Sequence, residues 1–357
     1  MLDLEARFFI EYGYRPAHVS TGIQLVDEGL CHDMTLLLNV LREEIRNHNL
    51  QSIDLPLSGG FDSRLLLAIL VEMGLKNNIQ LRTWGTPGIY DFDIPIQISR
   101  SLDVPILLHD QSLFDYSLEN LVEERNYNQS TLFFHTYYGS MNHNSCIVTG
   151  VAGDILFGSS QDYRVKTADD AKSHYLKGKR INNLYQDNDY YDLISYESFG
   201  GSFLPNEEIL LQHRSKLFYE PLIVKDSQDY FLPFLSEGVL TYFGARTRDY
   251  KSLSKLKLEL ESYICSVIGL FPSKNYYGLT SKSSHISLKV AKYWSRLHGH
   301  SKMANNFIPT GKVLDNLDFN FLTRYKQCCD YLNLDFSQLD VMKTVLPYLI
   351  DSDAKIS

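Results

Sequence analysis

The feature that most constrains this chain is an abrupt change from an apolar run to a glycine pair and back to an apolar run. Residues Ser52 to Leu57 alternate and end in buried-type side chains, which predicts a strand of a parallel sheet. Arg64 to Leu75 is dense in leucine, isoleucine and methionine, which predicts a helix packed on that sheet. Between them lie Gly59 and Gly60, and glycine can take backbone conformations closed to other residues. A strand that turns directly into a helix indicates an α/β unit.

The turn itself, Ser58 to Ser63, has the composition of a phosphate-binding loop. Main-chain NH groups at the two glycines and the positive end of the following helix suit phosphate oxygens, and Ser58 and Ser63 add hydroxyl donors. Asp62 would repel a bare phosphate, so its presence implies a Mg²⁺ ion between carboxylate and phosphate. The alternative is a plain glycine turn in which Asp62 and Ser63 cap the helix.

The chain after this loop alternates strands and helices. Strands are predicted over Ile79–Trp84, Val104–Leu108 and Ser145–Thr149, and helices over Asp33–Asn47, Asp91–Leu102 and Asp115–Asn126. This alternation predicts a doubly wound parallel sheet, whose ligands lie beyond the carboxyl ends of the strands. Gly59, Gly85 and Gly150 each stand at a predicted strand end, so we expect them to lie close together.

The flanking regions carry weaker signals. Residues 1 to 32 predict a short aromatic segment and loops, and residues 160 to 225 are rich in Tyr, Asp and Asn. The acidic run Asp187–Asp192 could hold a metal, but a solvated loop is the better interpretation. Helices are predicted again over Gly238–Arg248, Leu253–Gly269, Ile286–Leu297 and Asp335–Ile350.

Composition narrows the class of protein. The 357 residues, 44% of them apolar, can form one α/β domain with a helical extension. A net charge of -9 argues against a nucleic-acid partner, whose phosphates need basic surface, and disfavours a tRNA substrate. The five cysteines show no metal-binding spacing, and no run of about 18 uncharged apolar residues occurs. We therefore expect a cytoplasmic protein with no membrane partner and no signal peptide.

A second glycine-rich segment, Val148 to Gly158, follows the last predicted strand. Gly150 and Gly153 allow a close backbone approach, and Asp154 supplies a second carboxylate. Mg²⁺ held by Asp62 and Asp154 could neutralise pyrophosphate as it leaves. Taken alone, the segment fits a glycine-rich turn with a capping Asp better.

Together, these segments resemble a known family. Ser58–Ser63 resembles the pyrophosphate loop of the ATP pyrophosphatases (the PP-loop superfamily), and the ordered set resembles the synthetase domain of the asparagine synthetase family. The family's Ser-Gly-Glu-Gly-x-Asp-Glu-Leu-Phe-Gly-Gly run is matched by Thr149, Gly150, Asp154, Leu156, Phe157 and Gly158. Further resemblances lie in the adenosine-side strand and loop (Thr83–Asp93), the Val-Pro-Phe-Leu-Asp segment (Leu232–Leu235) and the Lys-x-x-Phe-Gly element (Phe271–Gly278).

The resemblance spans roughly residues 35 to 300 and implies an adenine nucleotide alpha hydrolase-like fold over 35–300. Residues 1–34 are then an N-terminal segment in which Tyr12–Pro16 resembles a remnant of the family's interdomain linker. Residues 301–357 are a helical C-terminal extension. The implied activity is an AMP-forming amide ligase that uses ATP and Mg²⁺: a small-molecule or peptide carboxylate attacks the α-phosphorus, pyrophosphate leaves, and ammonia or an amine displaces AMP. The nitrogen comes from free ammonia, from an amine in the substrate or from a partner amidotransferase.

The resemblance also implies roles for particular residues. Asp62 and Asp154 would hold the metal, and Lys274 would stabilise the pentavalent α-phosphorus. The residues implied to bind ATP or pyrophosphate are Leu57, Ser58, Gly59, Gly60, Asp62, Ser63, Thr83, Trp84, Gly85, Thr149 and Gly150. Outside this ordered context, an ordinary surface lysine would be the better interpretation of Lys274.

The departures from the family pattern leave alternatives open. Ammonia-using members carry Glu where this chain has Val151, and the family pattern is also broken at Ala152, Ile155, Phe231 and Ser236. Relatives that close lactams replace that Glu with a base elsewhere, for which the candidates are Glu123, Glu124, His135, Tyr137 and Tyr138. The sequence begins Met1-Leu2, without the N-terminal cysteine that a glutaminase uses, so we expect a synthetase domain without the glutaminase domain. A degenerate nucleotide-binding protein, or another PP-loop amination or tRNA-modifying enzyme, is the alternative.

Overall fold

The structure, a computed structural model, describes residues 3–19, 22–127, 131–132, 145–178, 181–182, 187–220, 229–297 and 310–354. Its centre is a five-stranded sheet of order β3-β2-β1-β4-β5 in which all neighbouring strands run parallel. The strands are β1 (Ile53–Pro56), β2 (Ile79–Gly85), β3 (Ile106–Asp110), β4 (Cys146–Val148) and β5 (Tyr230–Phe231). The predicted α/β class with a parallel sheet is confirmed. The strand order reverses direction between β1 and β4, and open α/β sheets bind ligands at such a point.

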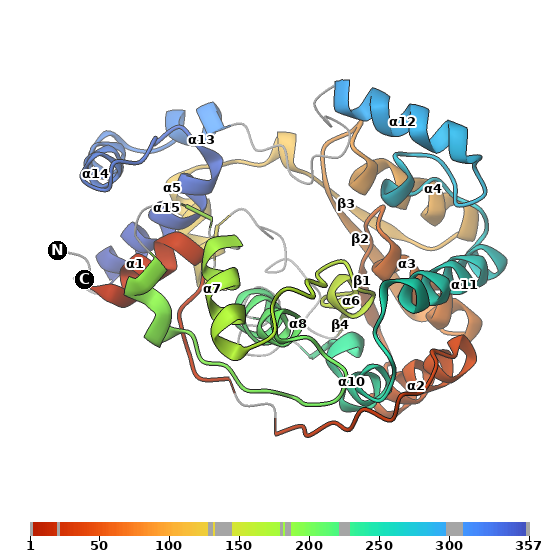
Figure 1. Cartoon of the computed structure of the whole chain (residues 1–357). Helices are drawn as coiled ribbons and strands as arrows, with labels where there is room; N and C mark the ends of the chain where they lie inside the picture. Colours follow the sequence, from red (N-terminus) through yellow and green to blue (C-terminus); the bar gives the residue numbers. More distant parts are fainter. Residues whose placement is uncertain are drawn as a thin grey trace.

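Helices flank the sheet and form the helical C-terminal part (Figure 1). Those before the last strand are α1 (Leu4–Tyr12), α2 (Met34–Asn47), α3 (Phe61–Glu72), α4 (Tyr90–Leu102), α5 (Leu118–Tyr127), α6 (Gly153–Leu156), α7 (Ala168–Gly178), α8 (Pro205–Ile209) and a π-helix over Leu210–Tyr219. Those after it are α10 (Glu237–Gly244), α11 (Tyr250–Ile268), α12 (His285–Leu297), α13 (Thr310–Asp315), α14 (Phe319–Tyr331) and α15 (Leu339–Ala354). Short 3-10 turns cover Lys76–Asn78, Gln111–Leu113, Asp187–Leu193, Pro233–Leu235 and Lys274–Tyr276.

Several predicted boundaries were wrong. The helix predicted from Arg64 begins at Phe61, because Phe61 to Ser63 already form its first turn. The strand predicted from Val104 begins at Ile106, and the helix predicted over Gly238–Arg248 ends at Gly244. The run Asp187–Asp192, expected to be a solvated loop, forms a 3-10 turn in which Tyr190 is buried and Asp192 is exposed.

The N-terminal segment, expected to be a short aromatic segment and loops, contains α1, which covers the aromatic part. Asp3 caps this helix by accepting a hydrogen bond from the Ala6 amide, and Gly13 ends it with a φ of 79° that favours glycine. The helix packs against α15, so the two ends of the chain lie side by side (Figure 1).

The buried side chains form two main clusters. The larger one surrounds the sheet and joins α2, α3, α10 and α11 to it. The second contains Ile10, Tyr116 and Leu121 together with residues of α13, α14 and α15. Figure 1 shows that the second cluster's helices lie at the opposite side of the molecule from α3 and α11. Among the described residues, no helix combines the length and apolar character needed to cross a bilayer.

A buried ion pair crosses the middle of the sheet. Arg82 on β2 donates from Nε and Nη2 to Asp54 on β1, over 2.6 and 2.9 Å, and the Ser145 hydroxyl adds a bond of 3.1 Å to the same carboxylate. Paired and hydrogen-bonded charges of this kind are tolerated inside a protein, whereas a lone charge is not. The pair therefore links β1, β2 and the start of β4 directly beneath the loop.

Candidate functional site

The glycine pair lies between β1 and α3, at the carboxyl edge of the sheet. Ser58 is tied to Ser63: its amide donates to Ser63 Oγ over 3.2 Å, and the two hydroxyl oxygens are 3.2 Å apart. Ser58 Oγ in turn accepts a bond of 3.1 Å from the Gly60 amide. A Cβ on Gly59 would lie 2.9 Å from the Tyr90 carbonyl oxygen, so this position requires glycine. The serines thus shape the loop, and the glycine lets it approach α4.

The second glycine-rich segment packs directly on this loop, as the sequence predicted. A Cβ on Gly150 would lie 3.0 Å from Asp62 Cβ and 3.1 Å from the Ser63 amide nitrogen. A Cβ on Gly153 would lie 2.6 Å from Asp62 Cγ and Oδ1. Only glycine leaves room for the Asp62 side chain at these two places. Ala152, between these two glycines, has a left-handed φ of 71°.

Asp62 has the electrostatic setting of a metal ligand. Its side chain is half-buried, and burial together with the negative charge of Asp154 raises the pKa of Asp62 to about 7, while Lys257 opposes this rise. A cation between the two carboxylates would relieve their repulsion, so the pair fits Mg²⁺. Among the described residues, no group of three or more His, Cys, Asp or Glu could enclose a metal. Two carboxylates with the remaining positions left to phosphate and water is the usual way proteins hold Mg²⁺.

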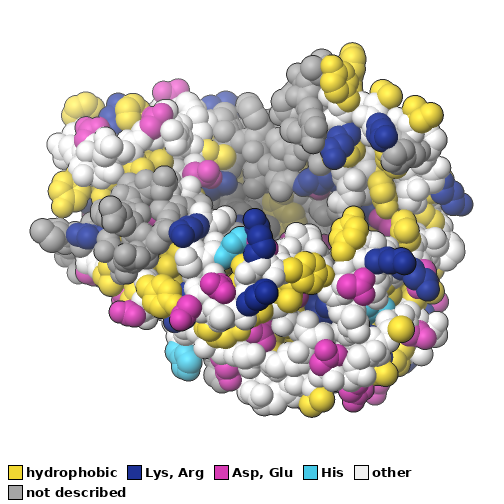
Figure 2. All heavy atoms as spheres, viewed as in Figure 1, with side chains coloured by type: hydrophobic (Ala, Val, Ile, Leu, Met, Phe, Trp, Pro, Cys, Tyr) yellow, Lys and Arg dark blue, Asp and Glu magenta, His cyan; other side chains and the backbone are white. Residues whose placement is uncertain are grey.

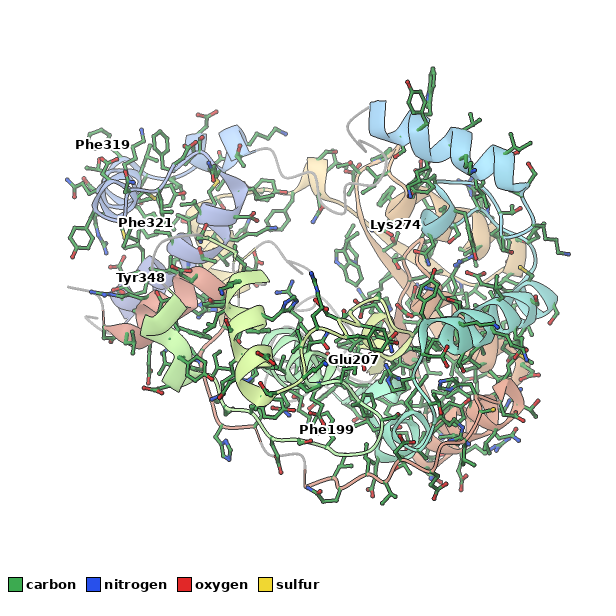
Figure 3. The ribbon with its side chains drawn as sticks, in the orientation of Figure 1. Phe199, Glu207, Lys274, Phe319, Phe321 and Tyr348 are labelled. Atoms are coloured by element: carbon green, nitrogen blue, oxygen red, sulfur yellow. The ribbon has the colours of Figure 1, made fainter. Side chains whose placement is uncertain are left out.

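Lys274 is brought to the same loop by the main chain. Its amide donates to the Gly59 carbonyl over 2.9 Å. Arg64 on α3 donates to the Gly60 carbonyl over 2.7 Å and to Ser273 Oγ over 2.8 Å, with Glu261 of α11 at 3.4 Å. Figure 3 shows Lys274 beside this edge of the sheet, below α12. The structure therefore joins the first loop and the lysine segment.

The Lys274 ammonium bonds Asp91, a residue that sequence reasoning did not single out. Lys274 Nζ donates to Asp91 Oδ2 over 2.5 Å, and Asp91 Oδ1 accepts a bond of 3.0 Å from the Gly59 amide. One carboxylate thus occupies two donors that would suit a phosphate oxygen. Asp91 belongs to the Thr83–Asp93 run that the resemblance included, but that run contains two aspartates, Asp91 and Asp93, and its pattern does not distinguish which of them faces the loop.

The residues that the resemblance predicts to contact adenosine lie on β2 and in the turn between β2 and α4. Thr83 is buried and its hydroxyl donates to the Asp91 carbonyl over 2.6 Å. Trp84 stacks on His109 with ring centres 5.4 Å apart. A Cβ on Gly85 would lie 2.6 Å from Ile89 Cδ1. Leu57 is buried and donates its amide to the Arg82 carbonyl over 2.8 Å. These residues border the site, and a role in binding ATP stays a prediction for them.

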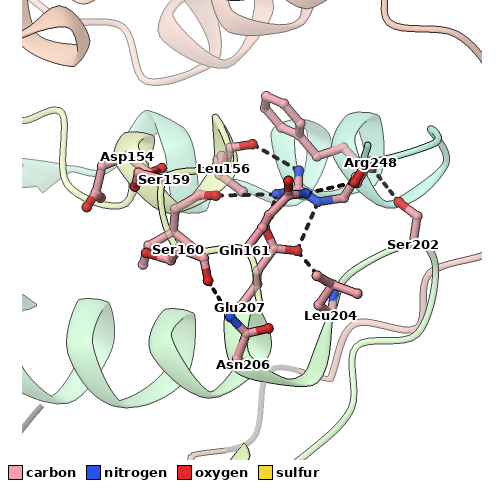
Figure 4. Close-up of polar contacts among 12 residues, drawn as sticks. Asp154, Leu156, Ser159, Ser160, Gln161, Ser202, Leu204, Asn206, Glu207 and Arg248 are labelled. Atoms are coloured by element: carbon pink, nitrogen blue, oxygen red, sulfur yellow. Dashed lines mark hydrogen bonds and ion pairs between the residues drawn. The ribbon is translucent and has the colours of Figure 1, made fainter. Parts of the chain in front are cut away.

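A buried ion pair holds the second segment from outside (Figure 4). Arg248 donates to the carbonyls of Leu156 and Ile155 over 3.0 and 3.3 Å, at the end of α6. Glu207 on α8 accepts from the same guanidinium over 2.5 and 3.2 Å, and both side chains are almost fully buried. Because α6 contains Asp154, this pair sets the position of that carboxylate. No spacing in the sequence connects residues 154, 207 and 248, so the pair was missed.

The described candidates for the missing base do not lie beside Val151. Glu124 is buried on α5 near Tyr116, a residue of the second cluster, and Glu123 on the same helix is exposed. Figure 1 places α5 among the C-terminal helices, away from β4 and α6. His135, Tyr137 and Tyr138 lie outside the described residues. Thr149, the predicted neighbour of the α-phosphate, is buried and donates its amide to the Phe231 carbonyl over 3.3 Å.

Comparison with known proteins adds little to this geometry. The sequence matches no family model and no curated protein. Among solved structures, NMN synthetase from Francisella tularensis aligns over 75% of this chain and 94% of its own, with 12% identity and a TM-score of 0.24. At this score the likeness supports no conclusion about function. The fold assignment rests on the strand order and the parallel pairing of this chain.

Proposed function

We propose that this protein is an ATP-dependent, AMP-forming amide ligase of the asparagine synthetase type. The observation that carries the proposal is the meeting of three segments at one edge of the sheet: the Ser58–Ser63 loop, the Gly150–Asp154 turn packed against Asp62, and Lys274 bonded to the loop. Phosphate-binding amides, two carboxylates suited to Mg²⁺ and a nearby ammonium are what a pyrophosphate leaving group needs. The lack of a kinase-type lysine within the loop favours attack at the α-phosphorus.

Each residue then has a specific task. The amides of Gly59 and Gly60, which here bond Asp91 and Ser58 Oγ, would turn to pyrophosphate oxygens together with the hydroxyls of Ser58 and Ser63. Asp62 and Asp154 would hold Mg²⁺, which would supply positive charge to the leaving group. Lys274 exchanges its Asp91 partner for the oxygens of the α-phosphate as their charge grows.

The substrate that accepts the adenylyl group is a small-molecule or peptide carboxylate. The nitrogen comes from ammonia or an amine, with a partner amidotransferase as one source, and the compartment that fits is the cytoplasm.

A second candidate is a nucleotide-binding protein of the same fold that has lost its chemistry. Two observations favour it: Val151 stands where the family's Glu handles the amine proton, and Asp91 already occupies the Gly59 amide and the Lys274 ammonium. The presence of Val151 weakens only the attack of the amine, because adenylation of the carboxylate comes before that attack. The two candidates therefore differ in whether any carboxylate elicits AMP and pyrophosphate.

Exchange of labelled pyrophosphate into ATP, screened over candidate carboxylates, tests the proposal. With an active carboxylate, Lys274→Ala should lower the exchange rate by about 10²-fold or more and leave ATP affinity nearly unchanged, because the lysine acts on the transition state. The matched control is Lys255→Ala, an exposed lysine on α11, which should change neither value. A loss confined to ATP affinity would make Lys274 a binding residue, and no exchange with any carboxylate would favour the binding protein.

A further inference from the structure

The helix α12 turns its most apolar side away from the protein. Ile286, Val290, Tyr293 and Trp294 are 75%, 60%, 64% and 62% exposed. Their spacing of four, seven and eight residues places them on one side of the helix. The half-buried positions are Leu288, Ala291 and Ser295, so the side that faces the protein is the smaller and less apolar one. Most amphipathic helices of a globular protein show the reverse arrangement.

The same part of the chain has an unusual charge. Residues 262–314 contain no Asp or Glu, although the whole chain has a net charge of -9. Among the described basic residues of this stretch, Lys282, Lys289 and Lys292 are exposed on α12 or just before it, whereas Lys274 is paired with Asp91 and Lys312 lies on α13. Lys289 and Lys292 are exposed and lie along one flank of the apolar side. Figure 2 shows hydrophobic side chains at the upper rim of the molecule, where Figure 1 places α12, with Lys and Arg side chains below them.

We propose that α12 binds the surface of an anionic lipid bilayer, with Ile286, Val290, Tyr293 and Trp294 inserted between the headgroups. A short helix with an apolar side that includes aromatic rings, and with lysines along its flank, is suited to lie in the plane of the interface. The lysines reach anionic headgroups while the rings occupy the boundary between headgroups and acyl chains. This peripheral contact needs no spanning helix, and it departs from the expectation of no membrane partner.

We infer a bilayer and not an acidic protein because α12 combines an exposed apolar side with lysines on its flank. The binding of such a helix to a membrane increases with its buried apolar area and with its attraction to anionic lipids, and α12 offers both. A bilayer also requires no complementary groove. Because α12 packs against the turn Lys274–Tyr276, attachment would hold the candidate site close to the interface. The proposal is independent of the function proposed above, since it concerns only attachment.

Flotation of the full chain with vesicles tests this proposal. We expect binding to vesicles of equimolar phosphatidylcholine and phosphatidylglycerol at low salt, and at least roughly tenfold weaker binding to pure phosphatidylcholine or at high salt. Binding should shift the emission of Trp294 to shorter wavelength, and Trp294→Phe should remove that shift. Flotation that is absent with both kinds of vesicle overturns the proposal.

Variants separate the apolar and basic contributions. Ile286→Ser combined with Val290→Ser and Tyr293→Ser should reduce vesicle binding by about tenfold or more, and Lys289→Glu with Lys292→Glu should do the same only for anionic vesicles. All five residues are exposed, so far-ultraviolet circular dichroism should confirm an unchanged fold. The matched control is Phe319→Ser, an 81% exposed residue at the other side of the molecule, which should bind as the wild type does (Figure 3). Undiminished binding by the triple variant, or self-association through α12 without vesicle binding, overturns the proposal.

Discussion

The two glycine-rich turns of the candidate site are built in different ways. The first, Ser58–Ser63, is shaped by hydrogen bonds between its own residues, no more than five positions apart, and Asp91 and Lys274 bond its Gly59 from outside. The second, Gly150–Gly158, contains Ala152 in a left-handed conformation, and its end is held by Arg248, 92 positions away from Leu156. The first turn keeps its internal shape through its own serines, whereas the end of the second turn depends on a distant ion pair. Loss of Arg248 should therefore disturb the second turn more than the first.

The largest effect should come from removing the ion pair that holds the second turn. Arg248→Met leaves Glu207 buried without its partner, and loss of one member of such a pair costs about 3–5 kcal/mol of the free energy of unfolding. Urea unfolding measures this change. The control is Arg164→Met, whose pair with Asp162 is exposed on the arginine side and should contribute little.

A double variant sharpens the same test. Arg248→Met with Glu207→Leu removes both charges, so it should recover part of the stability lost in the single variant. In the double variant the carbonyls of Ile155 and Leu156 still lack the Arg248 donor. The second turn should therefore be displaced in the double variant as in the single one, and pyrophosphate exchange should be low in both. Full recovery of exchange would show that Arg248 does not position Asp154.

A smaller effect on stability, but a strong one on activity, is expected at the first turn. Asp62→Asn should lower Mg²⁺-dependent pyrophosphate exchange by roughly 10–100-fold or more, because a metal ligand is lost. It should leave the free energy of unfolding unchanged or higher at neutral pH, since burial and Asp154 disfavour the charge of Asp62. Unchanged exchange in this variant would contradict the metal assignment.

The pH dependence of Mg²⁺ binding should report the same carboxylate. With the pKa of Asp62 raised to about 7, the protonated form predominates below that pH and cannot bind the ion. Below pH 7, the apparent Mg²⁺ affinity should therefore increase with pH, by at most about tenfold for each pH unit. Above pH 7 it should level off. Between about pH 4 and 7 the folded state holds a proton that the unfolded state has lost, so metal-free stability relative to Asp62→Asn should fall as pH rises. Calorimetry and urea unfolding at several pH values measure both trends.

The smallest effect should come from Ala152→Gly. Glycine accepts the φ of 71° without the steric cost that alanine bears, so the variant should gain up to about 1 kcal/mol in free energy of unfolding. The opposite change, Gly153→Ala, should destabilise the chain and lower pyrophosphate exchange, because its Cβ would lie 2.6 Å from the Asp62 carboxylate. A loss of stability in Ala152→Gly would show that the turn does not hold alanine under strain.

The same contrast explains what the sequence could and could not predict. The parallel sheet and the first loop follow from apolar periodicity and glycine, which are local signals, and the parallel strands predict that Gly59 and Gly150 lie at the same edge. The strand β5 has only Tyr230 and Phe231, too short a run to show a period. Asp91 and Arg248 act through contacts with residues far away in the chain, and a single sequence contains no signal for such contacts.

The polar region from 160 to 225 shows the limit of composition. It looks solvated, yet Glu207, Glu208, Gln212 and His213 are buried on α8 and the π-helix. Glu208 accepts bonds from the Ser198 hydroxyl and the Phe199 amide, over 2.9 and 2.7 Å, and is also bonded by Tyr196. Buried polar groups are stable when each finds a partner, so polarity alone does not predict exposure. The roles of the site residues, and the division at residues 34 and 300, stay predictions.

The contact of Arg64 with Ser273 spans 209 positions, and it has a consequence for how the protein folds. Contacts between residues so far apart carry a large loop-closure cost and are characteristic of slow-folding chains. During synthesis at about 5–20 residues per second, the Ser58–Ser63 loop leaves the ribosome well before Lys274 is made. The sheet can begin to pair in that interval, while Arg64 has not yet met Ser273. The nascent chain thus passes through a stage in which the Ser58–Ser63 loop exists and Lys274 does not.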